Sequence, residues 1–238
     1  MKFLLKKNPR SRHFAVFLYN TQYMKTHRFI GEFNLNQNKI SITDPDVVNQ
    51  IRQVLHLKIG ERIVLGDGYG EEAIAEITGF GKDSVELSIL EKYKNQTEPK
   101  TKVVLYCSVL KKENFEWVVQ KATETGATEI IPVISERTIK LNLNLERLQK
   151  IAREATEQSG RGVMPKIGET LNFKEAIEKA KKENPVNVFF DSSGKTLNEI
   201  KLGKKIGLFI GPEGGWSENE KKLAEENGLE ILSLSLLT

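Results

Sequence analysis

The strongest constraint on the fold is the order of elements from residue 102 onward, where segments typical of strands alternate with segments typical of helices. The predicted strands are residues 102–110, 129–135, 186–191, 205–210 and 231–235, and the predicted helices are residues 112–125, 145–159, 173–182 and 217–227. Strands that alternate with helices form a parallel sheet covered on both faces. We therefore predict an α/β domain over residues 102–238.

The preceding part of the chain has a different pattern. Residues 24–95 contain several short strand-like runs, the turn sequence Gly66–Gly70, and one helix-like segment at 47–55. Short strands in sequence with turn residues between them predict a small β-barrel. Residues 91–102 are polar, contain Pro99 and are predicted to be a linker.

The first 23 residues carry five basic side chains and no acid. They lack the apolar stretch and cleavage site of a signal peptide. A transit-like leader is an alternative, but we expect a disordered extension, with Met24 as the natural start.

Composition narrows the function classes. The chain has one cysteine, so neither a disulfide framework nor a cysteine-based zinc site is expected. The three histidines are scattered, and we predict no metal site. The sequence has no apolar run of about 18 residues, and we expect a cytoplasmic protein without a membrane span. A net charge of +4 permits nucleic-acid binding without requiring it.

The segment Gly211-Pro212-Glu213-Gly214-Gly215 is the best candidate for a ligand site. It follows an apolar strand and precedes a helix with an S-x-x-E capping box, and ligands of open α/β sheets bind at the carboxyl ends of strands. It is neither a dinucleotide fingerprint nor a P-loop. A nucleoside-type ligand without a triphosphate fits it, although a glycine-rich turn with no ligand is an equal reading.

Other candidate residues are polar. Ser135–Thr138 ends a predicted strand, and the helix end 153–161 carries Arg153, Glu157, Gln158 and Arg161, of which Arg153 and Glu157 are spaced to form an ion pair. Arginine and glutamine there suit contacts with phosphate or base edges of RNA. The predicted RNA contacts of the barrel are His27, Arg28, Arg52, His56 and Lys58, for which a solvated surface is the alternative.

An ordered set of motifs gives the sequence a family resemblance. The motifs are residues 110–126, Pro132–Arg137, Glu154–Arg161, Pro165 and residues 210–218. Together they resemble the ribosomal RNA small subunit methyltransferase E family over residues 24–238. This family methylates N3 of a uridine in 16S ribosomal RNA with S-adenosylmethionine.

The resemblance implies a PUA-like N-terminal barrel, a C-terminal SPOUT domain with a trefoil knot, and a homodimer; knots are rare exceptions to the usual topology rules. It implies cofactor contacts from three strand ends and the glycine loop: Phe190, Asp191, Ile210, Gly211, Pro212, Glu213, Gly214, Gly215, Leu234 and Ser235. N3 of uridine must lose a proton before it attacks, so a base or a cation is needed near it. Glu136 with Arg137, or Glu157 with Arg161, are the candidates, and the sequence does not choose between them.

Three departures from the family pattern matter. Gln50 and His56 stand where the family has His and Arg around Val54-Leu55, and Thr125 replaces a usual Leu. The sequence also stops at Thr238, before a Leu-Arg-x-Glu-Thr-Ala segment that the family threads through its knot. We expect a chain cut there to bind the cofactor poorly. The alternative functions are a non-catalytic RNA-binding or ribosome-assembly protein, and a methyltransferase for another RNA.

Overall fold

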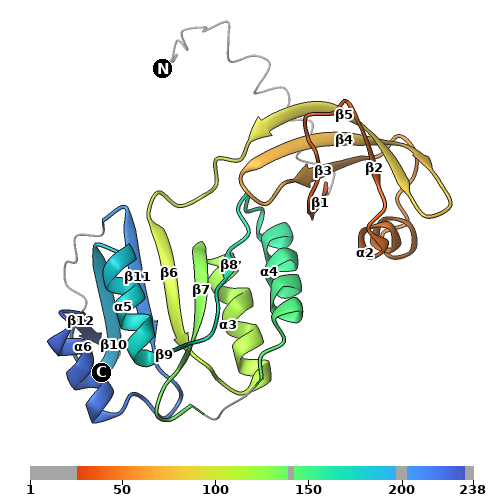
Figure 1. Cartoon of the computed structure of the whole chain (residues 1–238). Coiled ribbons are helices and arrows are strands. Elements are labelled where there is room, and N and C mark those ends of the chain that lie inside the picture. Colours follow the sequence, from red (N-terminus) through yellow and green to blue (C-terminus); the bar gives the residue numbers. More distant parts are fainter. Residues whose placement is uncertain (1–25, 139–141, 197–202, 234–238) are drawn as a thin grey trace, which may run out of the picture. The chain divides into compact units, whose positions relative to one another are not determined.

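The chain forms two compact units (Figure 1). The computed structural model describes residues 26–138, 142–196 and 203–233. The N-terminal unit ends at Tyr93, and the C-terminal unit starts at Lys94 and also takes in the short segment Asp67–Glu71. The predicted extension 1–23 lies outside the described residues, and the domain limits 24–95 and 102–238 stay a proposal.

From residue 26 onward, where the structure describes it, the N-terminal unit is a five-stranded sheet with two short helices. Its elements are β1 His27–Ile30, β2 Lys39–Ile42, α2 Pro45–Asn49, η2 Gln50–Val54, β3 Arg62–Gly66, β4 Glu71–Phe80 and β5 Val85–Lys94. The strand order is β1-β3-β4-β5-β2, with β1 parallel to β3 and the pairs β3–β4 and β2–β5 antiparallel. The prediction of a strand-rich N-terminal unit is confirmed, but β5 runs four residues into the predicted linker.

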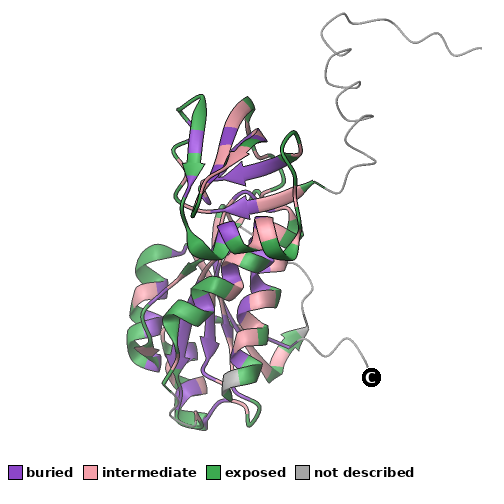
Figure 2. Ribbon diagram, turned by 90° about the vertical axis from the view of Figure 1, so that its right-hand side faces the viewer, coloured by how far each residue is buried: buried purple, intermediate pink, exposed green. Residues whose placement is uncertain are grey.

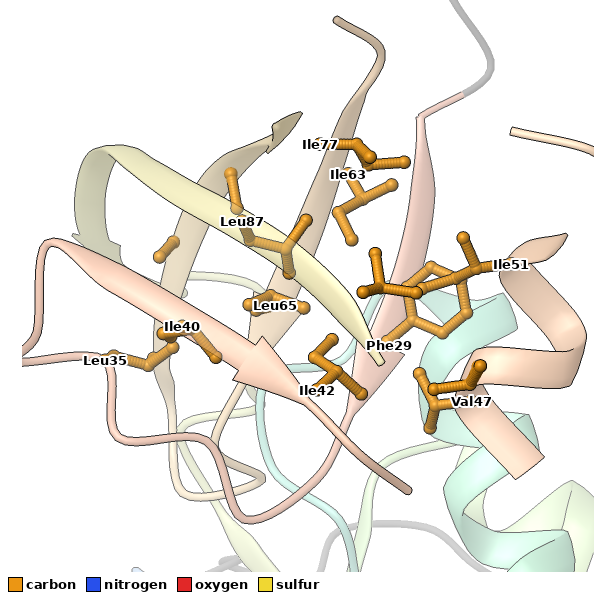
Figure 3. Packing of buried hydrophobic residues seen from close by; sticks show 14 residues of the cluster. Phe29, Leu35, Ile40, Ile42, Val47, Ile51, Ile63, Leu65, Ile77 and Leu87 are labelled. Carbon is orange, nitrogen blue, oxygen red and sulfur yellow. The ribbon is translucent and has the colours of Figure 1, made fainter. Parts of the chain in front are cut away.

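Apolar side chains of the sheet and helices meet in one core (Figure 3). Phe29, Ile63 and Leu87 come from three strands, and Val47 and Ile51 come from the helical segment. This segment starts two residues earlier than the predicted helix 47–55. Asp44 caps it by accepting from Asp46 N at 2.9 Å, and a proline suits the first helical position.

Over its described residues, the C-terminal unit is a parallel sheet with four helices. Its elements are β6 Lys102–Ser108, α3 Lys112–Glu124, β7 Ala127–Ile134, α4 Leu145–Ser159, β8 Lys166–Ile167, β9 Leu171–Asn172, α5 Phe173–Glu183, β10 Val186–Thr196, β11 Lys205–Ile210, α6 Glu218–Glu226 and β12 Glu230–Ser233. The strand order is β12-β10-β11-β6-β7-β8, with β9 also on β7. The predicted α/β class with a SPOUT-like parallel sheet is confirmed.

The alternation of side chains along β6 divides the core of this unit into two layers. Val104 and Tyr106 pack with residues of α5 and α6, whereas Leu105 and Cys107 pack with residues of α3 and α4. Successive residues of a strand point to opposite faces of the sheet. The helices therefore cover the sheet in two pairs, and in Figure 2 its strands are largely buried while the outer helix faces are exposed.

The predicted helix limits in this unit are close to the observed ones. Helix α4 spans the predicted residues and ends at Gly160, which has the left-handed φ of 74° that glycine tolerates best. The predicted capping box of α6 is present between Ser217 and Glu220. Strand β10 is longer than predicted, because it continues past residue 191 to Thr196 alongside β12.

Trp117 shows one limit of the helix pattern. Its large apolar side chain favours burial, but Trp117 is 69% exposed and does not pack in the core. Its helical neighbours Phe115 and Val119 are fully buried, so Trp117 lies on the outer face of α3.

Candidate functional site

The glycine-rich loop at the end of β11 includes a left-handed backbone conformation that glycine adopts most readily. Gly215 has a φ of 70°, and its N–H donates to Pro212 O at 2.8 Å, which closes a tight turn. A Cβ on Gly211 would lie 2.9 Å from Trp216 Nε1. Gly214 is exposed, so the loop presents unobstructed backbone to a ligand.

Trp216 holds this loop onto the sheet. Its indole is only 2% exposed and stacks on Phe189 with ring centroids 4.7 Å apart. Its Nε1 donates to Phe190 O at 3.1 Å, at the point where β10 passes the loop. Trp216 is thus the packed floor beneath the loop, and it brings the predicted cofactor contact Phe190 next to Gly211.

The turn after β7 is attached to the same loop. Arg137 Nη1 donates to Gly214 O in a short hydrogen bond. The carboxylate of Glu220, in α6, accepts two backbone hydrogen bonds. Its Oε1 accepts from Glu136 N at 2.9 Å, and its Oε2 accepts from Ser217 N at 2.9 Å. The structure therefore places the candidate residues Glu136 and Arg137 beside the glycine loop.

The acid in the loop is ionised at neutral pH. The pKa of Glu213 is lowered mainly by hydrogen bonds from its own backbone N–H and from Asn114 Nδ2, which donates to Glu213 Oε1 at 2.9 Å. The positive charge of Lys111 adds a smaller effect. Beneath Glu213, Cys107 is buried, and burial together with the charge of Glu213 raises the pKa of the thiol to about 12. The loop is negatively charged on the side that faces the start of α3.

A second acid lies at the neighbouring strand. Burial disfavours the ionised form of Asp191, but hydrogen bonds from Ser193 and Lys221 outweigh this and hold its pKa below the ordinary value. Ser193 N donates to Asp191 Oδ1 at 2.9 Å, and Lys221 Nζ lies 3.3 Å from the same oxygen. Asp191 is therefore a fixed negative charge at the edge of the site.

Arg161 lies at the other end of the sheet. It is 4% exposed and donates through Nη1 to Thr123 O at 2.9 Å and to Ala127 O at 2.8 Å, while Nη2 bonds Glu98 Oε2 at 2.7 Å. Ala127 begins β7, whereas Glu136 and Arg137 follow its last residue. Seven residue steps along a strand span about 23 Å. Within one chain, the two candidate catalytic pairs are separated by this length.

The predicted RNA contacts fall into both units. In the N-terminal unit, Arg28 forms an ion pair with the buried Glu72, and Arg52 Nη1 donates to Gly81 O at 3.0 Å and to Lys82 O at 3.1 Å. Only Nη1 of each arginine takes part in these bonds, and a guanidinium has five N–H donors, so either side chain could still donate to a phosphate. The other predicted contacts differ in exposure: His27 and Arg153 are half-buried, whereas His56, Lys58 and Gln158 are exposed.

Several predicted roles stay predictions, and two residues were missed. Leu234 and Ser235 lie outside the described residues. Asn114 and Glu98 were not singled out, because their partners are 99 and 63 residues away in sequence and no local pattern reveals such pairs. Within the described ranges, no helix is long and apolar enough to cross a bilayer, and no group of three or more His, Cys, Asp or Glu is placed to hold a metal ion.

Comparison with known proteins identifies the class that this fold and site define. Residues 97–236 match the family model of the RNA methyltransferase domain, and residues 42–90 match that of the RNA methyltransferase PUA domain. The chain is therefore an RNA methyltransferase with a PUA-type N-terminal unit.

Individual relatives define the family. The chain is 34% identical over 157 residues to the ribosomal RNA small subunit methyltransferase E of Mesomycoplasma hyopneumoniae (strain 232), covering 64% of this chain and 69% of the relative. It is 29% identical over 205 residues to that of Bacillus subtilis (strain 168), covering 79% and 80%. A crystal structure of the Neisseria gonorrhoeae enzyme bound to S-adenosyl methionine superimposes with a TM-score of 0.82 at 31% identity over 90% of each chain. The chain belongs to the ribosomal RNA small subunit methyltransferase E family.

Proposed function

We propose that this chain transfers a methyl group from S-adenosylmethionine to N3 of a uridine in 16S ribosomal RNA, in the cytoplasm and as a homodimer. The observation that carries the proposal is the attachment of Arg137 to Gly214, which joins a candidate base and cation to the exposed glycine loop. The solved relative from Neisseria gonorrhoeae holds S-adenosyl methionine in the same fold.

The residues around the loop fit this cofactor. Gly214 leaves backbone open. Phe190 and Ile210, on the adjacent strands β10 and β11, supply partly buried apolar surface, and Asp191 and Glu213 supply negative charge near a cationic ligand. When bound, S-adenosylmethionine supplies a methyl group already activated by its positively charged sulfur.

The protein must then make the uridine nitrogen nucleophilic. In this proposal the carboxylate of Glu136 accepts the N3 proton, and the guanidinium of Arg137 stabilises the negative charge that spreads to the flanking carbonyl oxygens. We assign these roles to Glu136 and Arg137 rather than to Glu157 and Arg161. The reason is that Arg161 is buried at the far end of β7 and already bonds Glu98 and two carbonyl oxygens.

Cofactor binding is tested by calorimetry with S-adenosylmethionine on the wild type and on Gly214→Val. The nearest atom to an added Cβ is Arg137 Cδ at 3.6 Å, so we expect the variant to fold normally and to lose binding. Gly79→Val is the matched control, since its Cβ would meet only Glu86 at 3.9 Å, and it should bind normally. Absence of binding in the wild type would favour the non-catalytic alternative.

The reaction itself is tested on unmodified small ribosomal subunits and on free 16S ribosomal RNA. Mass spectrometry of nuclease fragments should locate a single methyl group at N3 of a uridine. Glu136→Gln should lower kcat while leaving the affinity for S-adenosylmethionine within about twofold. A methyl group on another base, or on another RNA when cellular RNA is offered, would refute the assignment of substrate.

A further inference from the structure

We propose that Tyr69 is a stacking platform for an unpaired base of the RNA substrate. Tyr69 stands in the turn Asp67-Gly68-Tyr69-Gly70-Glu71 between β3 and β4, and this turn belongs to the methyltransferase unit. The inference rests on the proposed function only because it requires an RNA substrate. It adds that the enzyme recognises an unpaired base of this RNA.

The ring of Tyr69 is 86% exposed, the largest exposed fraction among the large apolar side chains of the described residues. Single exposed apolar residues are common on protein surfaces, so exposure alone carries no function. What distinguishes Tyr69 is that an exposed ring stands on a turn whose backbone is held firmly at several points.

The turn is rigid within itself. Asp67 Oδ1 accepts from Tyr69 N at 2.7 Å and from Glu71 N at 3.1 Å, and Asp67 N donates to Glu71 O at 3.1 Å. Gly68 and Gly70, on either side of the tyrosine, have φ values of 77° and 108°, which glycine adopts without strain. These two residues turn the backbone so that the side chain between them is presented outward.

The turn is also fixed to the methyltransferase unit. Met164 N donates to Gly68 O at 3.0 Å, Asn95 N donates to Gly70 O at 2.8 Å, and Tyr69 forms an isolated antiparallel bridge with Val163. Val163 N in turn donates to Glu98 Oε1 at 3.0 Å. The ring is therefore held on the same hydrogen-bonded framework that positions the end of α4.

An exposed, pre-positioned ring suits a nucleobase. Proteins recognise single-stranded RNA by stacking splayed bases on aromatic side chains, and a ring fixed in advance loses little entropy on binding. A phosphate is a poorer ligand for this turn, because the carboxylates of Asp67 and Glu71, on either side of Tyr69, would repel its negative charge. We therefore infer an unpaired base rather than a phosphate as the ligand of Tyr69.

The test measures the affinity of the full chain for unmodified 16S ribosomal RNA at several salt concentrations. Tyr69→Ala should weaken binding about 5- to 150-fold, the range that corresponds to the usual stacking contribution. Tyr69→Phe should bind within about twofold of the wild type. The salt slope should be unchanged in both variants, because stacking releases no counterions.

Controls separate stacking from other causes. Trp117→Ala removes another exposed aromatic ring and should leave RNA affinity unchanged, and a fully paired RNA duplex should not distinguish Tyr69→Ala from the wild type. The thermal midpoint and the affinity for S-adenosylmethionine should stay the same in Tyr69→Ala.

Two outcomes would overturn the inference. One is RNA affinity within twofold of the wild type in Tyr69→Ala. The other is a loss of affinity for assembled subunits but not for naked RNA, which would make a ribosomal protein the partner. If RNA binding depends on Tyr69 but no methyl transfer to uridine N3 occurs, the proposed function fails and the stacking platform stands.

Discussion

Glu220 gives a prediction whose size follows from the structure. It is 4% exposed, and its two carboxylate oxygens each accept one backbone N–H at 2.9 Å, from Glu136 and from Ser217. In Glu220→Gln, the single amide oxygen can serve only one of these donors, and the amide NH₂ faces the other. A buried donor without a partner costs about 1–3 kcal/mol, and the change from a charged to a neutral acceptor weakens the remaining bond by about 1 kcal/mol. We expect a loss of about 2–4 kcal/mol in the free energy of unfolding.

The chain contains a matched control for this change. Glu175 completes the same kind of capping box with Asn172 at the start of α5, where it accepts from Asn172 N at 2.9 Å, but it is exposed. Glu175→Gln keeps an oxygen for that donor, and surface substitutions usually cost less than about 0.5 kcal/mol. The difference between the two variants therefore isolates the bond that joins α6 to the turn at Glu136.

Guanidinium unfolding curves give the two free energies, and hydrogen–deuterium exchange gives a local measurement. Peptides that contain Glu136 should exchange faster in Glu220→Gln and at the wild-type rate in Glu175→Gln. If both variants lost the same stability within about 0.5 kcal/mol, or if exchange at Glu136 did not change, the connecting role of Glu220 would be refuted.

Three other changes test separate parts of the structure. Gly211→Ala places a Cβ 2.9 Å from Trp216 Nε1, and overpacking of this kind costs about 1–3 kcal/mol, which a lower thermal midpoint should show. Arg161→Ala leaves the carboxylate of Glu98 without its buried partner and should destabilise by about 3–5 kcal/mol in denaturant unfolding. Burial raises the pKa of Cys107 from the ordinary 9.0 to about 12, so between these pH values the thiol is protonated in the folded protein and ionised in the unfolded chain. Ionisation therefore favours the unfolded chain, and the free energy of unfolding should fall as pH rises from 9.0 toward about 12.

Controls and contrary results for these three changes are available in the same chain. Gly203→Ala meets its nearest atom at 3.5 Å and should be neutral, so an equal loss in both glycine variants would contradict the clash at Gly211. Arg137→Ala should lower methyl transfer with little loss of stability, the reverse of Arg161→Ala. A thiol that folded protein exposes to rapid alkylation at pH 9 would contradict the burial of Cys107.

The fold was predictable from sequence where local signals are strong. The apolar spacing of α4 and the glycine that follows it gave both limits of the helix, and Ser217 with Glu220 gave the start of α6, because capping depends on residues only three apart. The end of β10 was not predictable, since residues 192–196 are polar side chains and one glycine, and their strand conformation depends on pairing with β12.

The candidate site was predictable only in part. The glycine loop was identified from its place between a strand and a capped helix, which is a local pattern. Which candidate pair lies beside the loop depends on which end of β7 it is near. Glu136 follows the last residue of β7, whereas Arg161, the partner proposed for Glu157, bonds the first residue of that strand. Both candidates pair a glutamate with an arginine, so only the three-dimensional path of the chain separates them.

The two tryptophans of the chain lie in contrasting environments, and this gives the protein an intrinsic optical signal for its loop. Trp216 is buried against Phe189 and bonded to Phe190 O beneath the loop, whereas Trp117 is exposed on the far face of α3. Emission from a buried indole lies at shorter wavelength than emission from a solvated one, and only the solvated one is accessible to iodide. Replacing Trp117 by phenylalanine would leave a single fluorophore whose spectrum and lifetime report directly on the floor of the glycine loop as ligands are added.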